Sequence, residues 1–419
     1  MSFRFIHAAD LHLGSPLIGI ASRDPELASH LASASRQAFT ALVDQAIALH
    51  VAFLVIAGDI YDGGWKDTSI GLFFNRQVSR LVRAGIPVYT LRGNHDAESV
   101  VTQSVRLPDG VHEFPSRSAH TYWLEAEKVA LHGRSFPNRA VSENYALTYP
   151  PPRPGWFNIG VLHTSCDGRP GHDRYAPCSL DELVSRGYQY WALGHIHAYE
   201  QLHSNPHVFF PGNLQGRGIH ECGAKGALLV EVNGEDITAE RLILDRARWY
   251  DVAVDIEGVA ELDELHARLS ALLARCLSEA DPDSRLILAR IRLQGRTTLH
   301  PTLHSSKEQI RDDVQATLQH FGENVWLEQL MIETEEPLEI AAGAAVAVDA
   351  LNLCSALDTI IASGELAAEA NHLIAEVVRK LPAGASEQDI FGPLNIDRLI
   401  AEARERLLIR TGTGQEGRA

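Results

Sequence analysis

The chain has 419 residues, of which 45% are hydrophobic and 22% are charged, which predicts two or three globular domains and excludes a disordered or low-complexity chain. The 37 Lys and Arg residues against 54 Asp and Glu residues give a net charge of −17. This charge excludes a protein coated with basic side chains for nucleic-acid binding, although a local basic groove stays compatible with it.

The cysteines and the apolar segments indicate in which cellular compartment the protein is expected. The five cysteines are scattered and never spaced as C-x-x-C, which argues against a disulfide scaffold or a thiolate zinc site and fits a reducing compartment. The chain opens on a strand-like run at 3–9 without a basic leader, and the apolar stretch 340–348 is far shorter than the about 20 residues of a membrane span. We therefore expect a cytoplasmic protein with no membrane segment.

Short apolar runs alternate with amphipathic stretches over residues 1–245. The stretches 26–49 and 68–84 have apolar residues at helical spacing, so the pattern is that of βαβ units and predicts a layered α/β domain. Near 121–134 and 199–244, strand-like runs follow one another through turns, which indicates an antiparallel portion or a second packed sheet. The other predicted strands are 3–10, 52–59, 86–92, 158–163 and 190–194.

Two further regions follow the first. Residues 246–334 predict the order β-α-β-α-β, a small α+β domain, with Ser305-Ser306-Lys307-Glu308 as a capping box before its second helix. Residues 335–419 predict a helical C-terminal region with amphipathic stripes, one of which is formed by Leu366, Ala370, Leu373, Val377 and Leu381. Most of the acidity lies beyond the first region, because residues 1–245 carry 20 basic and 25 acidic side chains and the remainder carries 17 and 29.

Five short polar motifs lie at the ends of predicted strands in the first region. Each motif alone is common in turns and strand ends. In layered α/β sheets, however, the carboxyl ends of strands meet at one edge, where sites form, and residues two apart point the same way. Their occurrence together and in order therefore predicts one site. The motifs are Asp10-x-His12, Gly58-Asp59-x-x-Asp62, Gly93-Asn94-His95-Asp96, His163 and Gly194-His195-x-His197.

The donor atoms in these motifs predict a centre of two divalent metal ions. Nitrogen and oxygen donors without sulfur suit Mn, Fe or Zn, and we expect Mn²⁺, with Fe²⁺ or Zn²⁺ as alternatives. Seven protein ligands are too many for one catalytic ion with an open position, but they suit two ions bridged by a carboxylate. The centre stays net positive, which favours a phosphoric ester as substrate. The candidate ligands are Asp10, His12, Asp59, Asn94, His163, His195 and His197.

Four further side chains are candidates for catalytic, supporting or substrate-binding roles. His95 follows a candidate ligand but points to the other side of the chain, so we assign it to the substrate and the leaving oxygen. Asp62 or Asp96 would orient its ring. Arg217, beside a Gly-rich turn, is a candidate phosphate contact, with a solvated surface arginine as the alternative.

At these motifs the chain resembles the calcineurin-like metallophosphoesterase superfamily. The resemblance implies a β-sandwich flanked by helices around a binuclear site, with His95 as the catalytic histidine. It further implies that Asp59 bridges the ions, with Asp10, His12 and His197 on one ion and Asn94, His163 and His195 on the other.

A closer resemblance is to the SbcD-type DNA repair exonucleases. The opening 5–14 is similar to theirs, and 71–74 and 211–217 are more similar to the YhaO branch. The Pro-Ser pair usual after their Gly-Asp motif is replaced by 63–67, so polarity of digestion is not carried over. The resemblance implies a capping domain at 246–334, a helical tail that docks on an ABC-type coiled-coil ATPase of the SbcC kind, and a homodimer.

The sequence leaves three candidate functions for the protein. The leading hypothesis is a metal-dependent DNA exonuclease of DNA repair, favoured by the residues beyond 245, which a plain phosphatase does not need. The alternative is a small-molecule or phosphoprotein phosphoesterase, because the acidic first region gives DNA little electrostatic attraction. A non-catalytic subunit is the third, and the complete set of ligand types counts against it. No Walker motif is present, so ATP hydrolysis would require a partner.

Overall fold

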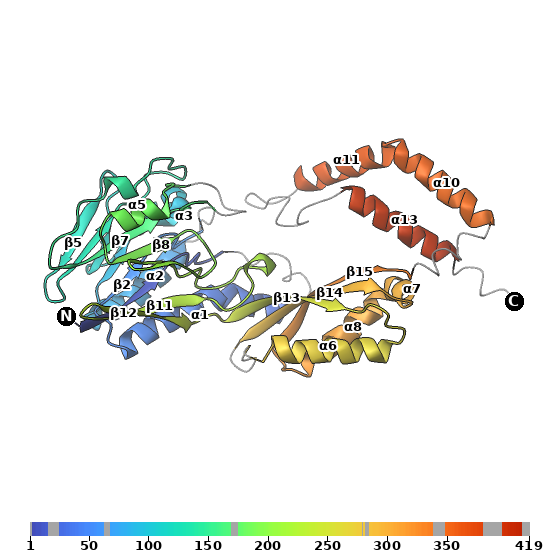
Figure 1. Cartoon of the computed structure of the whole chain (residues 1–419), viewed down its shortest axis with the longest axis horizontal. Helices are drawn as coiled ribbons and strands as arrows, with labels where there is room; N and C mark the ends of the chain where they lie inside the picture. The colour runs from blue at the N-terminus through green and yellow to red at the C-terminus, as the bar shows by residue number, and fades with distance from the viewer. Residues whose placement is uncertain are drawn as a thin grey trace. The chain divides into compact units, whose positions relative to one another are not determined.

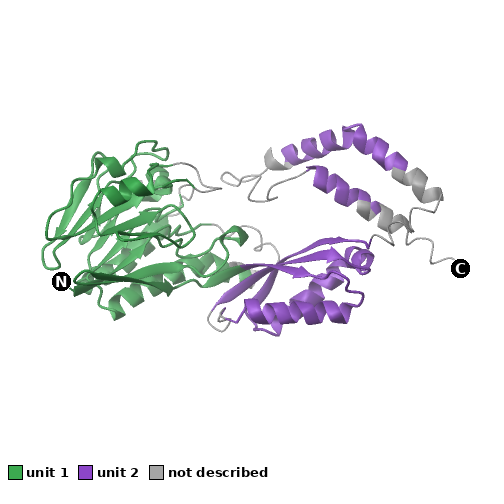
Figure 2. Ribbon diagram, viewed as in Figure 1, with its two compact units in different colours: residues 1–249 green, residues 250–419 purple. Residues whose placement is uncertain are grey.

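The computed structural model divides the chain into two compact units, Met1–Trp249 and Tyr250–Ala419 (Figure 2). The sequence segment 63–67 and the core of the late apolar stretch, 340–347, lie outside the described residues. Among the helices that are described, none is both long and apolar enough to cross a membrane. The structure describes residues 2–15, 25–62, 68–168, 175–278, 280, 285–337, 348–379 and 396–412.

A mixed sheet of six strands forms one layer of the described part of unit 1. Its central strands are parallel and almost wholly apolar, because both of their faces are covered. β11 joins antiparallel to β1, and β12 joins antiparallel to β11. In spatial order the strands are β12 (Asp236–Ile243), β11 (Gly226–Asn233), β1 (Ser2–Ala8), β2 (Phe53–Ile56), β3 (Val88–Thr90) and β4 (Val111–Glu113).

A second six-stranded sheet packs on the first, within the same described region. β6, β7, β8 and β10 are parallel, and antiparallel strands form both edges. The expected second packed sheet is therefore present. In spatial order the strands are β5 (His120–Leu124), β6 (Val129–Gly133), β7 (Phe157–His163), β8 (Tyr190–Gly194), β10 (His207–Phe210) and β9 (Glu200–Ser204).

Aromatic rings fill the space between the two sheets. Phe5 stacks on Phe53 with ring centroids 4.9 Å apart, and it meets Tyr190 of the second sheet edge-on at 5.3 Å. Such rings bury large apolar areas and prefer these offset and edge-to-face arrangements. This shared core holds the two sheets face to face as the two layers of a sandwich (Figure 1).

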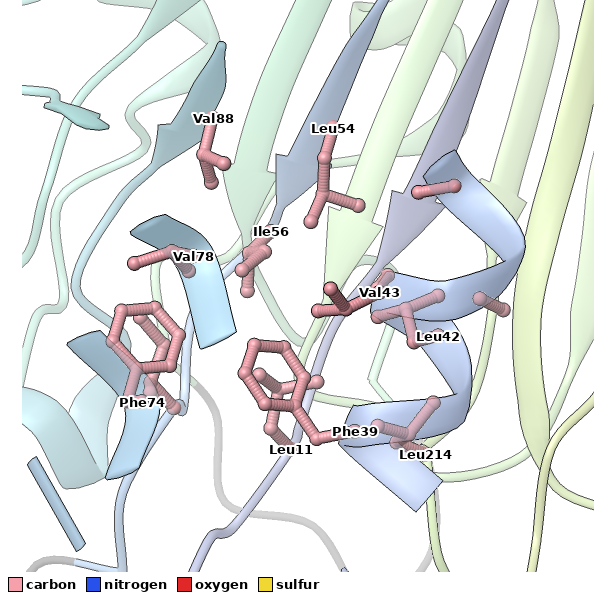
Figure 3. Close-up of a cluster of buried hydrophobic side chains, with 14 of the residues drawn as sticks. Leu11, Phe39, Leu42, Val43, Leu54, Ile56, Phe74, Val78, Val88 and Leu214 are labelled. Carbon is pink, nitrogen blue, oxygen red and sulfur yellow. The ribbon is translucent and has the colours of Figure 1, made fainter. Parts of the chain in front are cut away.

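Helices cover the outer faces of the sandwich. From α1, Phe39, Leu42 and Val43 point toward Leu54 and Ile56 of β2 (Figure 3). This arrangement confirms the expected β-sandwich flanked by helices. The helices described in unit 1 are α1 (Pro25–Ala48) and α2 (Thr68–Arg83) on the first sheet, α5 (Leu180–Ser185) and the 3-10 turn η1 (Ala146–Thr148) beside the second, the short α3 (Asn94–Glu98) and α4 (Val100–Ser104), and the 3-10 turn η2 (Ile219–Glu221).

Unit 2 has a three-stranded sheet with helices around a separate apolar core, within its described residues. The predicted β-α-β-α-β order is present, with a short extra helix, α7. The predicted capping box is wrong: Ser305 ends α7, Ser306 has a ψ of 30°, and the Ser306 side chain makes no cap hydrogen bond. The elements are β13 (Ala247–Asp255), whose first three residues belong to unit 1, followed by α6 (Leu262–Cys276), β14 (Leu286–Arg296), α7 (His300–Ser305), α8 (Lys307–Gln319) and β15 (Val325–Glu335).

The C-terminal region is helical where it is described. Large apolar side chains of these helices stay exposed, including Leu366 and Leu373 of the predicted stripe, at 43% and 54%. Leu381, the last residue of that stripe, lies outside the described residues. The helices are α10 (Val348–Ala362), α11 (Glu365–Arg379) and α13 (Ile396–Gly412).

Candidate metal centre

The five sequence motifs meet at one edge of the sandwich. Three follow β1, β2 and β3 of the first sheet, and two follow β7 and β8 of the second. The two sheets are joined here by the backbone N–H of His195, which donates to Asp10 Oδ2 at 2.9 Å, and by His163 Nδ1, 2.9 Å from the carbonyl oxygen of Ala57. Residues as far as 185 positions apart in the sequence are thus neighbours.

The backbone at this edge is strained. Four candidate ligands have positive φ angles: Asp10 at 51°, His12 at 41°, Asp59 at 52° and His195 at 101°. A non-glycine residue adopts this conformation at a cost of about 1 to 3 kcal/mol, and such strain is concentrated at functional sites. The sharp turns aim the side chains out of the strand ends and toward one another.

Asp10, His12 and His197 form one cluster. Their ligand atoms lie within 4.8 Å of one another. Nε2 of His12 is 3.2 Å from Nε2 of His197, and Asp10 Oδ1 is 4.0 Å from the same His197 atom. Two imidazole nitrogens on a shared tetrahedral ion, each at about 2.1 Å, would be about 3.4 Å apart. The Nδ1 atom of His12 is buried without a hydrogen-bond partner. The two imidazoles and the carboxylate of this cluster are groups that bind a cation.

Asp59, Asn94 and His163 form a second cluster beside the first. His163 Nε2 lies 2.9 Å from Asn94 Oδ1 and 3.4 Å from Asp59 Oδ2. Because the carbonyl oxygen of Ala57 requires the ring proton on Nδ1, Nε2 of a neutral ring turns its lone pair toward two oxygen acceptors. Such a set repels itself unless a positive charge lies between its members, so these residues fit a metal ion. His195 adjoins them, with its ring centroid 5.2 Å from that of His163.

The two candidate aspartates are fully enclosed, at 1% exposure each. Burial raises the pKa of Asp10, although His197 and His163 counteract it. Burial also opposes ionisation of Asp59, but the neighbouring His163 and His95 hold the pKa of this carboxyl well below its usual range. For the His163 ring, burial is outweighed by Asp59, which raises its pKa to about 9. The site therefore requires positive charge beside buried carboxylates.

His95 lies on the open side of the centre. Its Nδ1 is 3.0 Å from Asp62 Oδ1, and its side chain is 31% exposed. Burial lowers the pKa of His95, but Asp62 and Asp59 together raise it above the usual value. Asp96 instead accepts hydrogen bonds from the backbone N–H groups of Ile60 and Tyr61, at 3.1 and 3.0 Å. Of the two residues expected to orient His95, Asp62 makes the contact, and Asp96 ties the turn after β2 to the turn after β3.

Arg217 lies beside the centre and not in open solvent. Its guanidinium is bound by Glu221, with Nη2 to Oε1 at 2.8 Å, and its side chain is 27% exposed. Glu221 was not found from the sequence. Glu221 follows His197 by 24 residues in the sequence. A nearby residue that could have pointed to it is Arg217, four residues earlier, at a spacing that allows an ion pair.

Two family profiles match the chain: calcineurin-like phosphoesterase over residues 3–199, and the middle domain of metallophosphoesterase YhaO over residues 249–335. The uncharacterized metallophosphoesterase YhaO of Bacillus subtilis is 33% identical over 338 residues, which cover 79% of this chain and 82% of the relative. The DNA double-strand break repair protein Mre11 of Methanopyrus kandleri is 25% identical and covers 64% of this chain and 62% of the relative. A dimetal phosphatase from Danio rerio, a solved structure, covers 57% of this chain and 95% of its own at 12% identity, with a TM-score of 0.35.

Proposed function

Because the chain belongs to the calcineurin-like metallophosphoesterases, in the group that includes YhaO, we propose that it hydrolyses phosphodiester bonds of DNA at the centre described above. The matches confirm the expected resemblance to this superfamily and to its YhaO branch. The chain is a metal-binding hydrolase of phosphoric esters, and its family uses a binuclear centre. The proposal is supported above all by the convergence of buried carboxylates and imidazoles with His95 on their open side.

The ligand assignment belongs to this proposal. Asp59, whose ligand atom lies within 4.8 Å of those of Asp10 and His163, would bridge the ions. When bound, two such ions activate a water molecule and neutralise charge on the phosphate during in-line displacement. Mn²⁺ is the expected metal, and elemental analysis of the purified protein distinguishes it from Fe²⁺ and Zn²⁺. Asp10, His12 and His197 complete one set, and Asn94, His163 and His195 complete the other.

His95 acts on the leaving group. Its Nδ1 is held by Asp62 at 3.0 Å, so the protonated ring directs its Nε2–H away from that carboxylate. A proton at this position is available to the departing sugar oxygen, which general acid catalysis requires. Arg217, held by Glu221 beside the same centre, supplies a guanidinium for a phosphate oxygen.

DNA as the substrate is supported by the similarity to Mre11 and by the presence of unit 2. We propose that residues 246–334 form a capping domain and that 335–419 dock on a coiled-coil ATPase, with the protein cytoplasmic and dimeric. A phosphoesterase for small molecules or phosphoproteins is the second candidate, because residues 1–245 carry 20 basic and 25 acidic side chains. Phosphate contacts by Lys and Arg normally drive DNA binding, and this acidity opposes it.

The substrate class is tested with full-length protein loaded with Mn²⁺. Linear plasmid, closed circular plasmid and bis-p-nitrophenyl phosphate are digested side by side, with the Asp59→Asn variant as the control for contaminating nucleases. An exonuclease degrades linear DNA and the small ester but leaves closed circles intact. Turnover of the small ester alone would contradict the DNA proposal and favour the second candidate.

The proposed binding of a coiled-coil ATPase depends on the helical C-terminal region, residues 335–419. The exposed Leu366 and Leu373 of α11 offer apolar contacts to a partner helix. Deletion of residues 338–419 is expected to abolish retention of a coiled-coil ATPase in co-purification while the small ester is still hydrolysed. Equal retention by the shortened chain would contradict docking through the tail.

A further inference from the structure

Glu221 contacts the second histidine of the Gly-His-x-His motif. It ends the 3-10 turn η2 (Ile219–Glu221), and its side chain is 13% exposed. His197 Nδ1 lies 2.8 Å from Glu221 Oε1, while Asn213 Nδ2 donates to Oε2 at 2.7 Å. The carboxylate is thus held on both oxygens beside the first cluster of the metal centre.

Arg217 adds a competing donor at the same place. Its Nη2 donates to Glu221 Oε1 at 2.8 Å, and the same Nη2 lies 3.2 Å from Nδ1 of His197. A carboxylate only accepts hydrogen bonds, so the His197 proton must sit on Nδ1 to satisfy Glu221. The lone pair is then on Nε2, which faces His12 Nε2 and Asp10.

Removal of the Glu221 carboxylate would favour the opposite tautomer of His197. The guanidinium, which only donates, would then use the Nδ1 lone pair as its acceptor, and the ring proton would move to Nε2. A protonated Nε2 has no lone pair for a metal ion. The histidine backbone would stay in place, because Lys225 Nζ donates to the carbonyl oxygen of His197 at 2.8 Å.

We infer that Glu221 is a positioning residue that selects the metal-binding tautomer of His197 and keeps Arg217 from blocking it. The Glu221 carboxylate thereby fixes the tautomer of His197, a proposed ligand of the first ion. It also fixes the position of the Arg217 guanidinium, which is proposed to contact the substrate phosphate. This inference rests on the proposed metal centre, but it does not require that DNA is the substrate.

The test is calorimetric titration of the metal-free full-length chain with Mn²⁺. Glu221→Ala is expected to weaken one of two binding events about 10- to 100-fold and to leave the other unchanged, as is usual for loss of a carboxylate behind a ligating histidine. The double variant Glu221→Ala with Arg217→Ala is expected to recover part of that affinity, because the competing donor is gone. Glu231→Ala, which removes a carboxylate 3.4 Å from Arg4 on the sheet, is the matched control and should bind like wild type.

Glu221→Gln separates folding from positioning. The amide preserves side-chain volume, so its metal-free melting temperature should stay close to that of wild type while its affinity falls. Wild-type affinity for both ions in Glu221→Ala would overturn the inference, and so would a double variant that binds more weakly than the single one. If wild type bound no Mn²⁺ at all, the metal centre itself would be wrong; two ions without DNA cleavage would contradict only the substrate.

Discussion

His95 lies on the open side of the centre and is the residue that we propose to act on the substrate. Asp62 lies 3.0 Å from its Nδ1, whereas the buried candidate ligands have their polar atoms turned toward one another. In the proposed centre, catalysis and metal binding therefore belong to different side chains, and substitutions at single residues should separate them.

The first prediction concerns His95→Asn. Loss of the general acid should lower hydrolysis of bis-p-nitrophenyl phosphate and DNA about 10²- to 10⁴-fold, with metal content unchanged. Elemental analysis and initial rates measure the two effects. His50→Asn, at an exposed position, is the control and should retain full activity. A His95→Asn protein with wild-type rates would exclude the catalytic role.

The second prediction concerns His7, which lies in the core of β1. Its Nε2–H donates to the carbonyl oxygen of Leu193 and its Nδ1 accepts from the Tyr190 hydroxyl, so the ring is neutral. Burial, partly offset by the Leu193 hydrogen bond, lowers the pKa of His7 to about 3. The unfolded chain takes up this proton first as the pH falls below about 6.5, so the free energy of unfolding decreases from there toward pH 3.

Urea unfolding at pH 6.5 and pH 5 measures this effect. Between these values wild type should lose up to about 2 kcal/mol more than His7→Gln, since each pH unit between the two pKa values is worth about 1.4 kcal/mol. The exposed His30→Gln variant should keep the wild-type pH dependence. An identical pH dependence in wild type and His7→Gln would show that His7 does not contribute.

At the scale of elements, the turn between β3 and α3 sets how closely the strand ends approach one another. A Cβ atom on Gly93 would lie 2.3 Å from Asp59 Oδ1 and 2.8 Å from His163 Cε1. Glycine is therefore required by the approach of the backbone to the candidate bridging carboxylate, at a φ of −85° that any residue adopts.

The third prediction is that Gly93→Ala weakens metal binding by displacing Asp59, while the sandwich still folds. Mn²⁺ titration and a thermal melt of the metal-free protein measure the two properties. Gly234→Ala in the β11–β12 hairpin is the contrasting control: its Cβ meets nothing within 4 Å, but its φ of 68° costs stability. It should therefore melt lower and bind Mn²⁺ normally. Unchanged affinity in Gly93→Ala would show that the turn has room to relax.

At the scale of the whole molecule, the two units have separate apolar cores, and the proposed metal ligands all lie in unit 1. Ligand binding to the folded state alone stabilises only the part that binds. Mn²⁺ should therefore stabilise the sandwich and leave the unfolding of unit 2 unaffected.

The fourth prediction is that EDTA lowers the melting temperature of unit 1. At a free ion concentration 100 times the dissociation constant, binding contributes about 2.7 kcal/mol, which chelation removes. Trp326 is in unit 2 and the other tryptophans are in unit 1, so fluorescence of a Trp326→Phe variant follows the sandwich alone. Asp59→Asn should not respond to EDTA. A wild-type sandwich that melts equally with Mn²⁺ and with EDTA would contradict the centre.

Sequence by itself determined that a strand precedes or carries each of the five motifs and which donor atoms the motifs offer, because strand periodicity and residue type are local properties, but it placed the ends of β1, β2 and β3 two or three residues too late. It left open whether Asp62 or Asp96 meets His95, and it did not reveal Glu221. Only the tertiary structure decided these points, since they depend on which turns become neighbours across the two sheets. The prediction of a capping box failed for the same reason. The backbone conformation at Ser306 depends on how α7 and α8 pack on the sheet, and the four residues of the motif do not determine that packing.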